Sequence, residues 1–470
     1  MTNYLYQQLV RDLTEQIQTG QRAIGERMPS VRQLSRDQAV SKSTVLAAYN
    51  RLEADGLITA RPRSGYFVAL PQIAPSRPLK PPRPSQPETT PVPITAGQVL
   101  VDIMEKGAAF DLVSSHDRSS GNDQLRRCMA RAQRRQTNAE QMNYDQPAGL
   151  YSLRQQLVPR LAHGGSRVQA DDLVITAGCQ NALLLALMAT SQRGDVVAVE
   201  SPGFYGVFQL LEVLGLKVLE LPSSAELGLS PEALELALQH WDIKTLVVSP
   251  CYGTPTGASM PELHKQRIIE LIQNRGIAVI EDDIYGDLGF SLQRPRTLHS
   301  YDDSGSVLLC SSFSKSLSRD LRIGWIAAGR YRDKVKQLKL VTTLASSCSQ
   351  QQGLSFFLEE GGYDRHLRLR QQQLQQQYQQ LLQMIPEYLP MAVSCSQPQG
   401  GLSLWLEFAE TVDTLKLYKR ALDAGIILTP GRLFTAQERY HNALRVSFAH
   451  PWTEPRKAAL SRLGELLAGS

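Results

Sequence analysis

The sequence predicts a multidomain protein in which a small helical domain with a short β-hairpin precedes a larger α/β domain. Its 470 residues exceed what one compact core usually contains, which favours two or three domains. Residues 71–97 hold nine prolines and few apolar side chains, a composition typical of a semi-extended linker. We therefore expect one domain at 1–70, the linker at 71–97, and a second domain at 98–470 with a small C-terminal α+β subdomain from about residue 355.

Positive charge is concentrated near the N-terminus. Residues 1–97 hold twelve Lys and Arg against seven Asp and Glu, whereas the rest of the chain holds equal numbers of both kinds. We therefore expect an anionic partner at the N-terminal domain rather than a generally basic protein. The six cysteines are scattered, no apolar run approaches the roughly 20 residues that span a bilayer, and no signal peptide is evident. These features favour a cytoplasmic protein without a membrane partner.

The first 70 residues have the periodicity of three helices and two strands. We expect helices at 4–19, from residue 30, and from residue 40 to about 55, followed by strands at 57–60 and 66–69. Ser30 is the expected N-cap of the second helix, and Leu34 and Ala39 continue its apolar face. Gly56 ends the third helix. This order predicts a helix-turn-helix followed by a β wing.

The start of the third helix carries hydrogen-bond donors. A recognition helix presents its N-terminal residues to the major groove of DNA. Ser41, Lys42, Ser43 and Thr44 supply hydroxyl and amine groups there, although Ser43 or Thr44 can equally cap the helix. Arginines on the preceding helix and on the wing can hold DNA phosphates, namely Arg32, Arg61 and Arg63.

This segment resembles the GntR-type winged helix over nearly all of residues 1–70. The matching runs are Pro-Ser-Val-Arg at 29–32, Val-Ser-Lys-Ser-Thr-Val at 40–45, Ala-Tyr at 48–49, Leu-Glu at 52–53, Gly-Leu-Ile at 56–58 and Ser-Gly-Tyr-Phe-Val at 64–68. The alternative is a packing domain without DNA contacts. The resemblance implies contacts with double-stranded DNA from Arg32, Lys42, Ser43, Thr44 and Gly65.

Beyond the linker, short apolar runs alternate with amphipathic stretches. Such alternation is typical of a mostly parallel sheet covered by helices on both faces. The glutamine-rich stretch 371–383 has Leu374, Tyr378, Leu381 and Leu382 at helical spacing, which predicts an amphipathic helix. The other expected elements are strands at 172–176, 196–200, 246–249, 277–281, 307–310, 402–408 and 444–448, and helices at 181–190 and 261–274.

Lys315 is the most informative side chain. It follows the strand expected at 307–310 and stands in the run Ser-Phe-Ser-Lys-Ser-Leu-Ser-Arg-Asp-Leu-Arg at 312–322. A lysine at a strand exit can hold a carbonyl group through an imine, and the hydroxyls around it can hold a phosphate together with Arg322. This combination suits an anionic cofactor with a carbonyl group.

Two further segments carry groups that pyridoxal phosphate needs, namely a carboxylate for its pyridine nitrogen and a cup for its phosphate. Asp282 follows the strand expected at 277–280 and can reach the nitrogen, although an aspartate after a strand more often caps a turn. Tyr285 can hydrogen-bond the ring's phenolic oxygen. Thr-Ala-Gly-Cys-Gln-Asn at 176–181 precedes an apolar helix, and a helix N-terminus binds anions.

Together these segments resemble fold-type I aminotransferases over about residues 98–470. The resemblance implies that pyridoxal 5′-phosphate binds covalently to Lys315, with Asp282 at its pyridine nitrogen. It implies phosphate contacts from Ser312, Arg322, Gly178, Cys179 and Gln180.

The same resemblance assigns three more positions. In Glu-Ser-Pro-Gly-Phe-Tyr at 200–205 the aromatic ring that stacks on the cofactor is Phe204, with Tyr205 as the alternative. Tyr144 matches a tyrosine that reaches the phosphate bound by the partner subunit. Arg445 matches the arginine that binds the α-carboxylate of an amino acid, a task suited to a guanidinium. A structural arginine is the alternative for Arg445.

One position departs from the aminotransferase pattern. The run Ser-Pro-Cys-Tyr-Gly-Thr-Pro-Thr-Gly at 249–257 has Thr254 where those enzymes usually carry an asparagine that holds the phenolic oxygen. The shorter hydroxyl puts efficient transamination in doubt, but not cofactor binding. Tyr252 lies in the same run without an assigned role.

The order of winged helix, proline-rich linker and aminotransferase-like domain resembles the MocR subfamily of bacterial transcriptional regulators. The resemblance implies a homodimer, often head-to-tail, in which the second domain senses a ligand. We expect an amino compound, or pyridoxal phosphate itself, to bind at Lys315 and to shift the geometry of DNA binding. The alternative is an active aminotransferase with an appended DNA-binding module.

Overall fold

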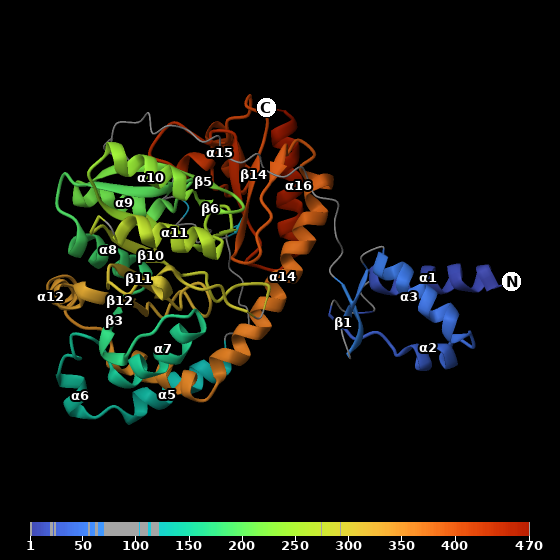
Figure 1. Cartoon of the computed structure of the whole chain (residues 1–470), viewed down its shortest axis with the longest axis horizontal. Helices are drawn as coiled ribbons and strands as arrows, with labels where there is room; N and C mark the ends of the chain where they lie inside the picture. The colour runs from blue at the N-terminus through green and yellow to red at the C-terminus, as the bar shows by residue number, and fades with distance from the viewer. Residues whose placement is uncertain are drawn as a thin grey trace. The chain divides into compact units, whose positions relative to one another are not determined.

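The computed structural model describes residues 2–18, 22, 25–54, 57–61, 64–69, 103, 111–113, 122–273, 275–291 and 293–469. The chain divides into two compact units, Met1–Ser76 and Arg77–Ser470 (Figure 1). The linker expected at 71–97, together with Gly56 and Arg63, lies outside the described residues. Within the described part of the chain, no helix has the length and apolar character needed to cross a membrane.

The first unit is a winged helix-turn-helix, as the sequence predicts. Its elements are α1 (Thr2–Gln18), α2 (Val31–Asp37), α3 (Lys42–Ala54), β1 (Ile58–Arg61) and β2 (Gly65–Val68). The two strands pair antiparallel, with Ile58 opposite Val68. Both residues share a buried core with Val45, Tyr49 and Leu52 of α3, so that the wing and the helices form one body.

Side-chain hydrogen bonds set the helix starts in this unit. Ser30 caps α2, because its hydroxyl accepts from the backbone N–H of Gln33 at 3.2 Å. Ser41 caps α3 in the same way, accepting from the backbone N–H of Thr44 at 3.1 Å. The prediction that Ala39 continues the apolar face of α2 is wrong. The helix ends before it, and Ala39 is exposed with a φ of 50°, a left-handed conformation that stops helical propagation.

The second unit is built on an eight-stranded sheet with the order β3-β12-β11-β10-β7-β4-β5-β6. The pairings among β11, β10, β7, β4 and β5 are parallel, whereas β12 and β6 run antiparallel to their neighbours. The predicted mostly parallel sheet is therefore confirmed, although β5, β6 and β12 are not among the predicted strands. The strands are β3 (Leu173–Thr176), β4 (Val196–Ser201), β5 (Lys217–Ser224), β6 (Gly228–Leu229), β7 (Ile243–Val248), β10 (Ala278–Asp282), β11 (Val307–Ser312) and β12 (Gly324–Ala327).

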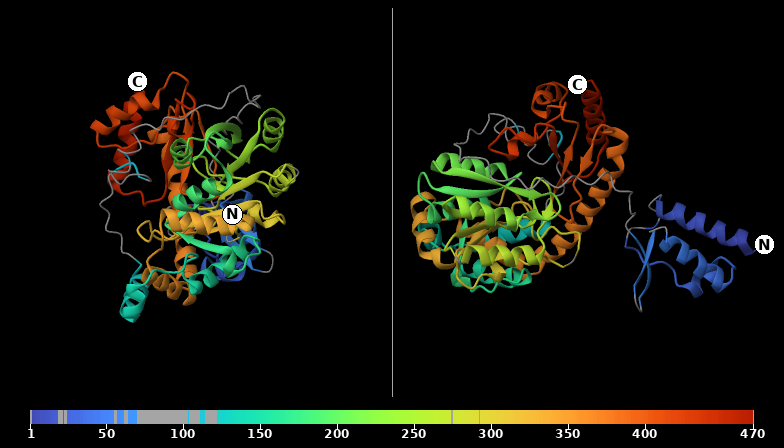
Figure 2. Two further views of the ribbon diagram at one scale, coloured as in Figure 1. Left: turned by 90° about the vertical axis from the view of Figure 1, so that its left-hand side faces the viewer. Right: turned by 45° about the horizontal axis from the view of Figure 1, so that its top comes forward.

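Helices cover both faces of this sheet (Figures 1 and 2). Val174 of β3 packs into a core with α8 and α9, whereas Leu173 and Ile175 pack into another with α5, α7 and α13. This alternation follows the two-residue period of a strand. The helices are α5 (Asp123–Arg135), α6 (Asn138–Met142), α7 (Tyr151–His163), α8 (Cys179–Thr190), α9 (Tyr205–Leu214), α10 (Pro231–His240), α11 (Glu262–Gln273), α12 (Arg332–Thr342) and α13 (Cys348–Glu359).

The C-terminal part forms a smaller α+β layer around a three-stranded antiparallel sheet with the order β13-β14-β15. Its long helix α14 contains the glutamine-rich stretch, and Leu374, Tyr378 and Leu381 enter the core as predicted, with Leu382 partly buried against it. The elements are α14 (Gly362–Tyr388), β13 (Ser394–Cys395), β14 (Ser403–Glu407), α15 (Thr414–Asp423), β15 (Ala443–Ser447) and α16 (Glu454–Ala468). The short elements of the second unit are η1 (Ala170–Asp172), β8 (Cys251–Gly253), β9 (Ala258–Ser259), η2 (Leu298–Tyr301), η3 (Gly329–Tyr331) and η4 (Gly431–Phe434).

Candidate functional site

Lys315 lies in the turn that follows β11. The apolar strand is fully buried, and Phe313 fixes the start of the turn by packing 4.9 Å from Trp325 and 5.2 Å from Tyr363, measured between ring centroids. Burial lowers the pKa of Lys315 to about 7, helped by the positive charges of Arg319 and Arg445 and opposed by Asp282. A large fraction of this lysine is therefore a neutral, nucleophilic amine near pH 7.

Asp282 is the last residue of β10, the parallel neighbour of β11, and pairs in register with Cys310. The carboxyl ends of parallel strands meet at one edge of a sheet, which brings Asp282 and Lys315 into electrostatic contact. One carboxylate oxygen accepts from Cys179 Sγ at 3.4 Å and from the backbone N–H of Ile284 at 3.3 Å. Burial raises the pKa of Asp282 to about 6, so the carboxylate is ionised at neutral pH and suits a protonated pyridine nitrogen.

The loop between β3 and α8, predicted to bind the phosphate, lies against Arg322. Arg322 donates to the carbonyl of Ala177 at 3.0 Å and to Ser314 Oγ at 3.5 Å. Gly178, with a φ of 85°, caps α8 without a side chain. A Cβ on Gly178 would lie 2.7 Å from Arg322 Nη2, so only glycine leaves room for the guanidinium beside the helix N-terminus.

The other residues predicted to contact the phosphate lie around this loop. Ser312 is buried at the end of β11, where its hydroxyl accepts from the backbone N–H of Ser314 at 3.3 Å. Cys179 and Gln180 occupy the first turn of α8, and Gln180 Nε2 donates to the carbonyl of Gly206 at 2.9 Å. The predicted phosphate residues are thus brought together from β3–α8 and from the turn after β11.

Tyr285 and Thr254 lie close to Arg445. Burial raises the pKa of Tyr285, while Arg445 and the Thr254 hydroxyl lower it, which makes the three side chains neighbours. The buried hydroxyl of Thr254 has no hydrogen bond of normal geometry to the described residues. An acceptor such as the phenolic oxygen of pyridoxal phosphate would satisfy it, so the residues present fit this cofactor.

Arg445 is buried in the middle of β15, opposite Trp405 of β14. Its backbone N–H donates to the carbonyl of Thr429 at 3.1 Å, and its Nη2 lies 3.4 Å from Thr429 Oγ1. Its Cζ lies 6.0 Å from the ring centroid of Tyr205. A guanidinium held in this way, in electrostatic contact with Lys315, can bind the carboxylate of an amine attached at the lysine.

The two candidate stacking rings differ in their neighbours. Phe204 caps α9 and packs against the core that contains Cys179, on the side of the phosphate loop. Tyr205 faces Arg445, and the centroids of the two aromatic rings are 4.8 Å apart. The geometry thus favours Phe204 for the cofactor ring and Tyr205 for the bound amine.

Among the residues predicted to contact the cofactor, Tyr144 lies at the surface of the chain. Its side chain is 80% exposed, on the segment between α6 and α7. The neighbouring Asp145 is fixed, because it accepts from Gln351 Nε2 at 2.6 Å. Within one chain, Tyr144 is therefore not part of the pocket around Lys315.

Several residues of the pocket are not among the predicted site residues. Glu200 is buried and accepts from the backbone N–H of Ser249 at 2.9 Å, and burial raises its pKa to about 8. Arg319 is in electrostatic contact with Lys315 and Arg445, whereas Arg370 and His450 are in such contact with Arg319. Glu200 and Arg319 stand inside the runs 200–205 and 312–322, whereas Arg370 and His450 carry no sequence signal.

Tyr252 has a structural role. It has a φ of 55° and is buried in the core of the smaller layer. A Cβ on Gly289 would lie 2.5 Å from its hydroxyl oxygen, and one on Gly400 would lie 2.9 Å from its ring. The tyrosine is therefore packed between two glycine backbones.

The residues of the first unit that are predicted to contact DNA fall into two groups, exposed and buried. Arg32, Lys42, Ser43 and Gly65 are exposed, whereas Thr44 is buried, with its hydroxyl 2.7 Å from that of Ser41. Ser41 is exposed but caps α3, as described above. On the wing, the guanidinium of Arg61 lies over the ring of Phe67 at 4.4 Å.

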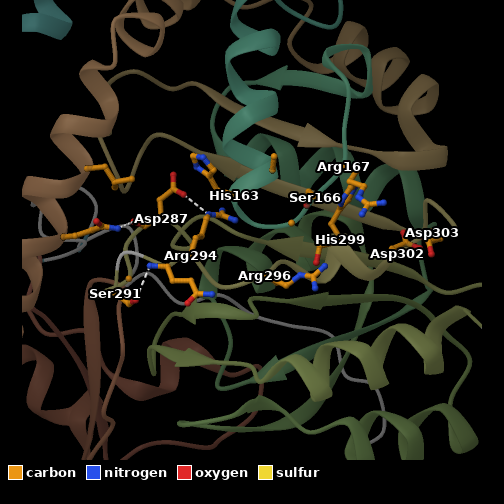
Figure 3. Close-up of a pocket in the computed structure, with 18 residues that line it drawn as sticks. His163, Ser166, Arg167, Asp287, Ser291, Arg294, Arg296, His299, Asp302 and Asp303 are labelled. Carbon is orange, nitrogen blue, oxygen red and sulfur yellow. Dashed lines mark hydrogen bonds and ion pairs between the residues drawn. The ribbon is translucent and has the colours of Figure 1, made fainter. Parts of the chain in front are cut away.

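A separate cavity of about 1000 Å³ lies in the second unit, lined by the end of α7, the β10–β11 connection and α14 (Figure 3). There Arg294 donates to Asp287 at 2.8 Å and forms an ion pair with Asp283. The hydroxyl of Tyr363 lies 2.9 Å from Asp287 and 2.8 Å from Ser316 Oγ, which links this cavity to the lysine turn. None of the predicted cofactor residues lines it.

Comparison with known families defines the class of protein. Residues 113–463 match the family of aminotransferases of class I and II, and residues 5–68 match the gntR family of bacterial regulatory proteins. The chain therefore belongs to the aminotransferase class I and II family, whose members depend on pyridoxal phosphate, and carries a gntR-type DNA-binding module. This combination is that of the MocR subfamily.

Individual relatives share the whole architecture. The chain is 40% identical to the uncharacterized HTH-type transcriptional regulator YjiR and 35% identical to the uncharacterized HTH-type transcriptional regulator YdcR, both of Escherichia coli, over 98% of each chain. Among solved structures, the α-aminoadipate aminotransferase LysN of Thermus thermophilus, in complex with N-(5′-phosphopyridoxyl)-L-leucine, is 25% identical. It matches with a TM-score of 0.71 and covers 79% of this chain and 95% of its own.

Proposed function

We propose that this protein is a transcriptional regulator that binds double-stranded DNA through its winged helix and pyridoxal 5′-phosphate through Lys315. One observation carries the proposal. Lys315 is in electrostatic contact with Asp282, and Arg322 of the same turn donates to the β3–α8 loop, on a chain that also holds a winged helix. The regulator names of YjiR and YdcR, which match over 98% of their length, support this function.

Pyridoxal phosphate, when bound, supplies a carbonyl group that amines capture and a ring that accepts electrons. Lys315 would hold the carbonyl, and Asp282 would keep the proton on the ring nitrogen. Arg322, Ser312 and the N-terminus of α8 would hold the phosphate. Thr254 and Tyr285 would bind the phenolic oxygen. The phosphopyridoxyl ligand named for the LysN structure supports the cofactor assignment.

We propose that the sensed ligand is an amino compound whose carboxylate Arg445 binds. An amine that displaces Lys315 changes the charges of the pocket, because a lysine with a pKa of about 7 is released. A ligand shifts a conformational equilibrium only through different affinities for the two states, and this change of contacts supplies such a difference. DNA binding by the winged helix would then depend on the ligand.

We further propose a homodimer, with the two chains arranged head-to-tail. Apolar side chains are exposed on α6, at Tyr144 and at the end of α12. A hydrogen bond from Gln351 to Asp145 holds the segment next to Tyr144 in place. A second copy would cover them and would place Tyr144 near the phosphate of its partner. Burial of such a surface is the usual reason for a stable dimer.

An active aminotransferase is the second candidate. The presence of Arg445 beside Lys315 and Asp282 favours it, because a protein that detects only the cofactor needs no carboxylate clamp. Turnover of an amino acid with a 2-oxo acid separates the two functions. A rate in the usual enzyme range of about 1–1000 per second would establish the enzyme.

The test of the proposed function combines two point variants of the full-length protein. A genome-wide map of DNA occupancy first identifies the operator. Lys315→Ala should then abolish the visible absorbance of the bound cofactor, and Lys42→Ala should weaken operator binding while leaving this absorbance intact. Absence of discrete occupied sites, or of the absorbance in the unmodified protein, would contradict the proposal.

A further inference from the structure

A chain of electrostatic contacts extends from Lys315 through Arg319 to Arg370 and His450. Arg319 is four residues beyond the lysine in the same turn, and its electrostatic neighbours are Tyr285, Arg445, Asp111 and Tyr205. Arg322, three residues further along, instead contacts Ala177 at the phosphate loop. The two arginines of one turn therefore have different neighbours.

Helix α14 brings a second arginine to the same side. Tyr363 and His366 contact the lysine turn, with the tyrosine hydroxyl 2.8 Å from Ser316 Oγ and His366 Nε2 2.9 Å from the Ser316 carbonyl oxygen. Arg370 follows His366 by one helical turn and so continues this face. Its Nη2 donates to the carbonyl of Ala449 at 2.6 Å, which ties it to the segment after β15.

His450 supplies an independent observation, a buried ring nitrogen without a hydrogen-bond partner among the described residues. Its Nε2 is buried and has no hydrogen bond to the described residues. Burial lowers its pKa, Asp111 opposes this shift, and Arg319, Arg456 and Arg370 reinforce it. A buried imidazole nitrogen beside several cations lacks an acceptor or donor that a bound polar group would supply.

Asp111, which is in electrostatic contact with Arg319 and His450, forms its ion pair with Arg456. Asp111 accepts from Arg456 Nη2 at 2.7 Å and from its Nε at 3.0 Å, and both side chains are almost completely buried. Burial, reinforced by the charge of Arg319, lowers the pKa of Arg370 to about 10. Repulsion of this kind is relieved when an anion enters between the guanidinium groups.

From this arrangement we infer that Arg319, Arg370 and His450 form a second anion-binding point, so that the effector is an amino acid with two acidic groups. This inference rests on the proposed function, in which Lys315 receives the amine and Arg445 the α-carboxylate. The side-chain acid, a carboxylate or a sulfonate, would then reach the space between the lysine turn and α14. Arg319 is exposed at the surface, so the ligand has access from solvent.

The experiment compares acids with their neutral amides of the same shape. The full-length protein, loaded with pyridoxal phosphate, is titrated with L-glutamate against L-glutamine and with L-aspartate against L-asparagine, and the change in cofactor absorbance is recorded. At least one acid should bind about tenfold or more tightly than its amide, because a charge-assisted hydrogen bond is lost in the amide. Equal affinities, or no response to either acid, would overturn the inference.

Variants identify the residues responsible. Arg319→Gln combined with Arg370→Gln should remove the preference for the acid, while the cofactor absorbance and operator binding show that the protein remains folded and loaded. Arg368→Gln, an exposed arginine of the same helix, is the matched control and should retain the preference. An unchanged preference in the double variant would assign the acid to another site. Loss of the cofactor absorbance in the unmodified protein would instead contradict the proposed function itself.

Discussion

At the scale of single residues, the pKa of Lys315 determines the pH range in which the protein can capture an aldehyde. The neutral amine is the reactive form, and its fraction falls tenfold per pH unit below the pKa. With a pKa of about 7, the rate of cofactor capture by the cofactor-free protein should rise up to about pH 7 and then level off. Stopped-flow absorbance between about pH 5.5 and 9 measures this profile. A rate that still rises at the alkaline end of this range would indicate an ordinary lysine.

The Arg319→Gln variant tests one cause of the lowered pKa of Lys315. Burial is the main cause of the lowered pKa, and the charge of Arg319 adds to it. Removing the charge makes the protonated amine less unfavourable, so the pKa rises and the profile should move to higher pH. Arg368→Gln should leave the profile in place. A shift to lower pH in Arg319→Gln would contradict the assigned electrostatics.

Arg294 is a buried cation that balances the charge of two carboxylates. It pairs with Asp283 and Asp287, and its side chain is only 12% exposed. Arg294→Met leaves both acids without their partner, which should destabilise the second unit by about 3–5 kcal/mol. The midpoint of denaturant unfolding, followed by far-ultraviolet circular dichroism, measures this change. Arg167→Met, an exposed position of the same cavity, should change the stability by less than about 0.5 kcal/mol.

The role of a residue can be predicted from the sequence when a local pattern of residue types indicates its chemistry. Lys315 and Asp282 each follow an apolar strand, and the parallel sheet brings strand ends together, so that their meeting could be predicted. Arg370 and His450 belong to a helix and a loop far from the lysine in sequence. Their contact with Arg319 depends on how α14 packs against the lysine turn, which no local pattern encodes.

At the scale of elements, the start of α3 separates a buried residue, Thr44, from a candidate DNA contact, Ser43. Thr44 is buried, whereas Ser43 is exposed beside Lys42. Thr44→Ala should lower the melting temperature of the first unit by removing a buried hydroxyl and methyl group. Ser43→Ala should leave that temperature unchanged and weaken operator binding. Differential scanning calorimetry and fluorescence anisotropy with labelled operator DNA measure the two effects, and the reverse assignment would contradict the geometry.

Elements with strong periodicity could be predicted from the sequence, and short or irregular ones could not. The glutamine-rich part of α14 places its leucines at helical spacing, so its inward face was evident. Ala39 fits the same spacing on α2, yet it lies outside the helix because the turn to α3 needs a residue in the left-handed region. The antiparallel strand β12 is short and completely buried, so it lacks the alternation that marks a half-buried strand.

At the scale of the whole molecule, the proposed dimer accounts for the apolar surface near Tyr144. Val341, at the end of α12, is 83% exposed, and Val213 on α9 is 81% exposed. Val341→Asp should therefore yield monomers, because it places a charge in an apolar interface, whereas Val213→Asp should leave the dimer intact. Sedimentation velocity of the full-length variants measures the association state. Because the partner would supply Tyr144 to the phosphate, monomers should also bind pyridoxal phosphate more weakly. A monomeric unmodified protein, or equal behaviour of the two variants, would remove Tyr144 from the cofactor site.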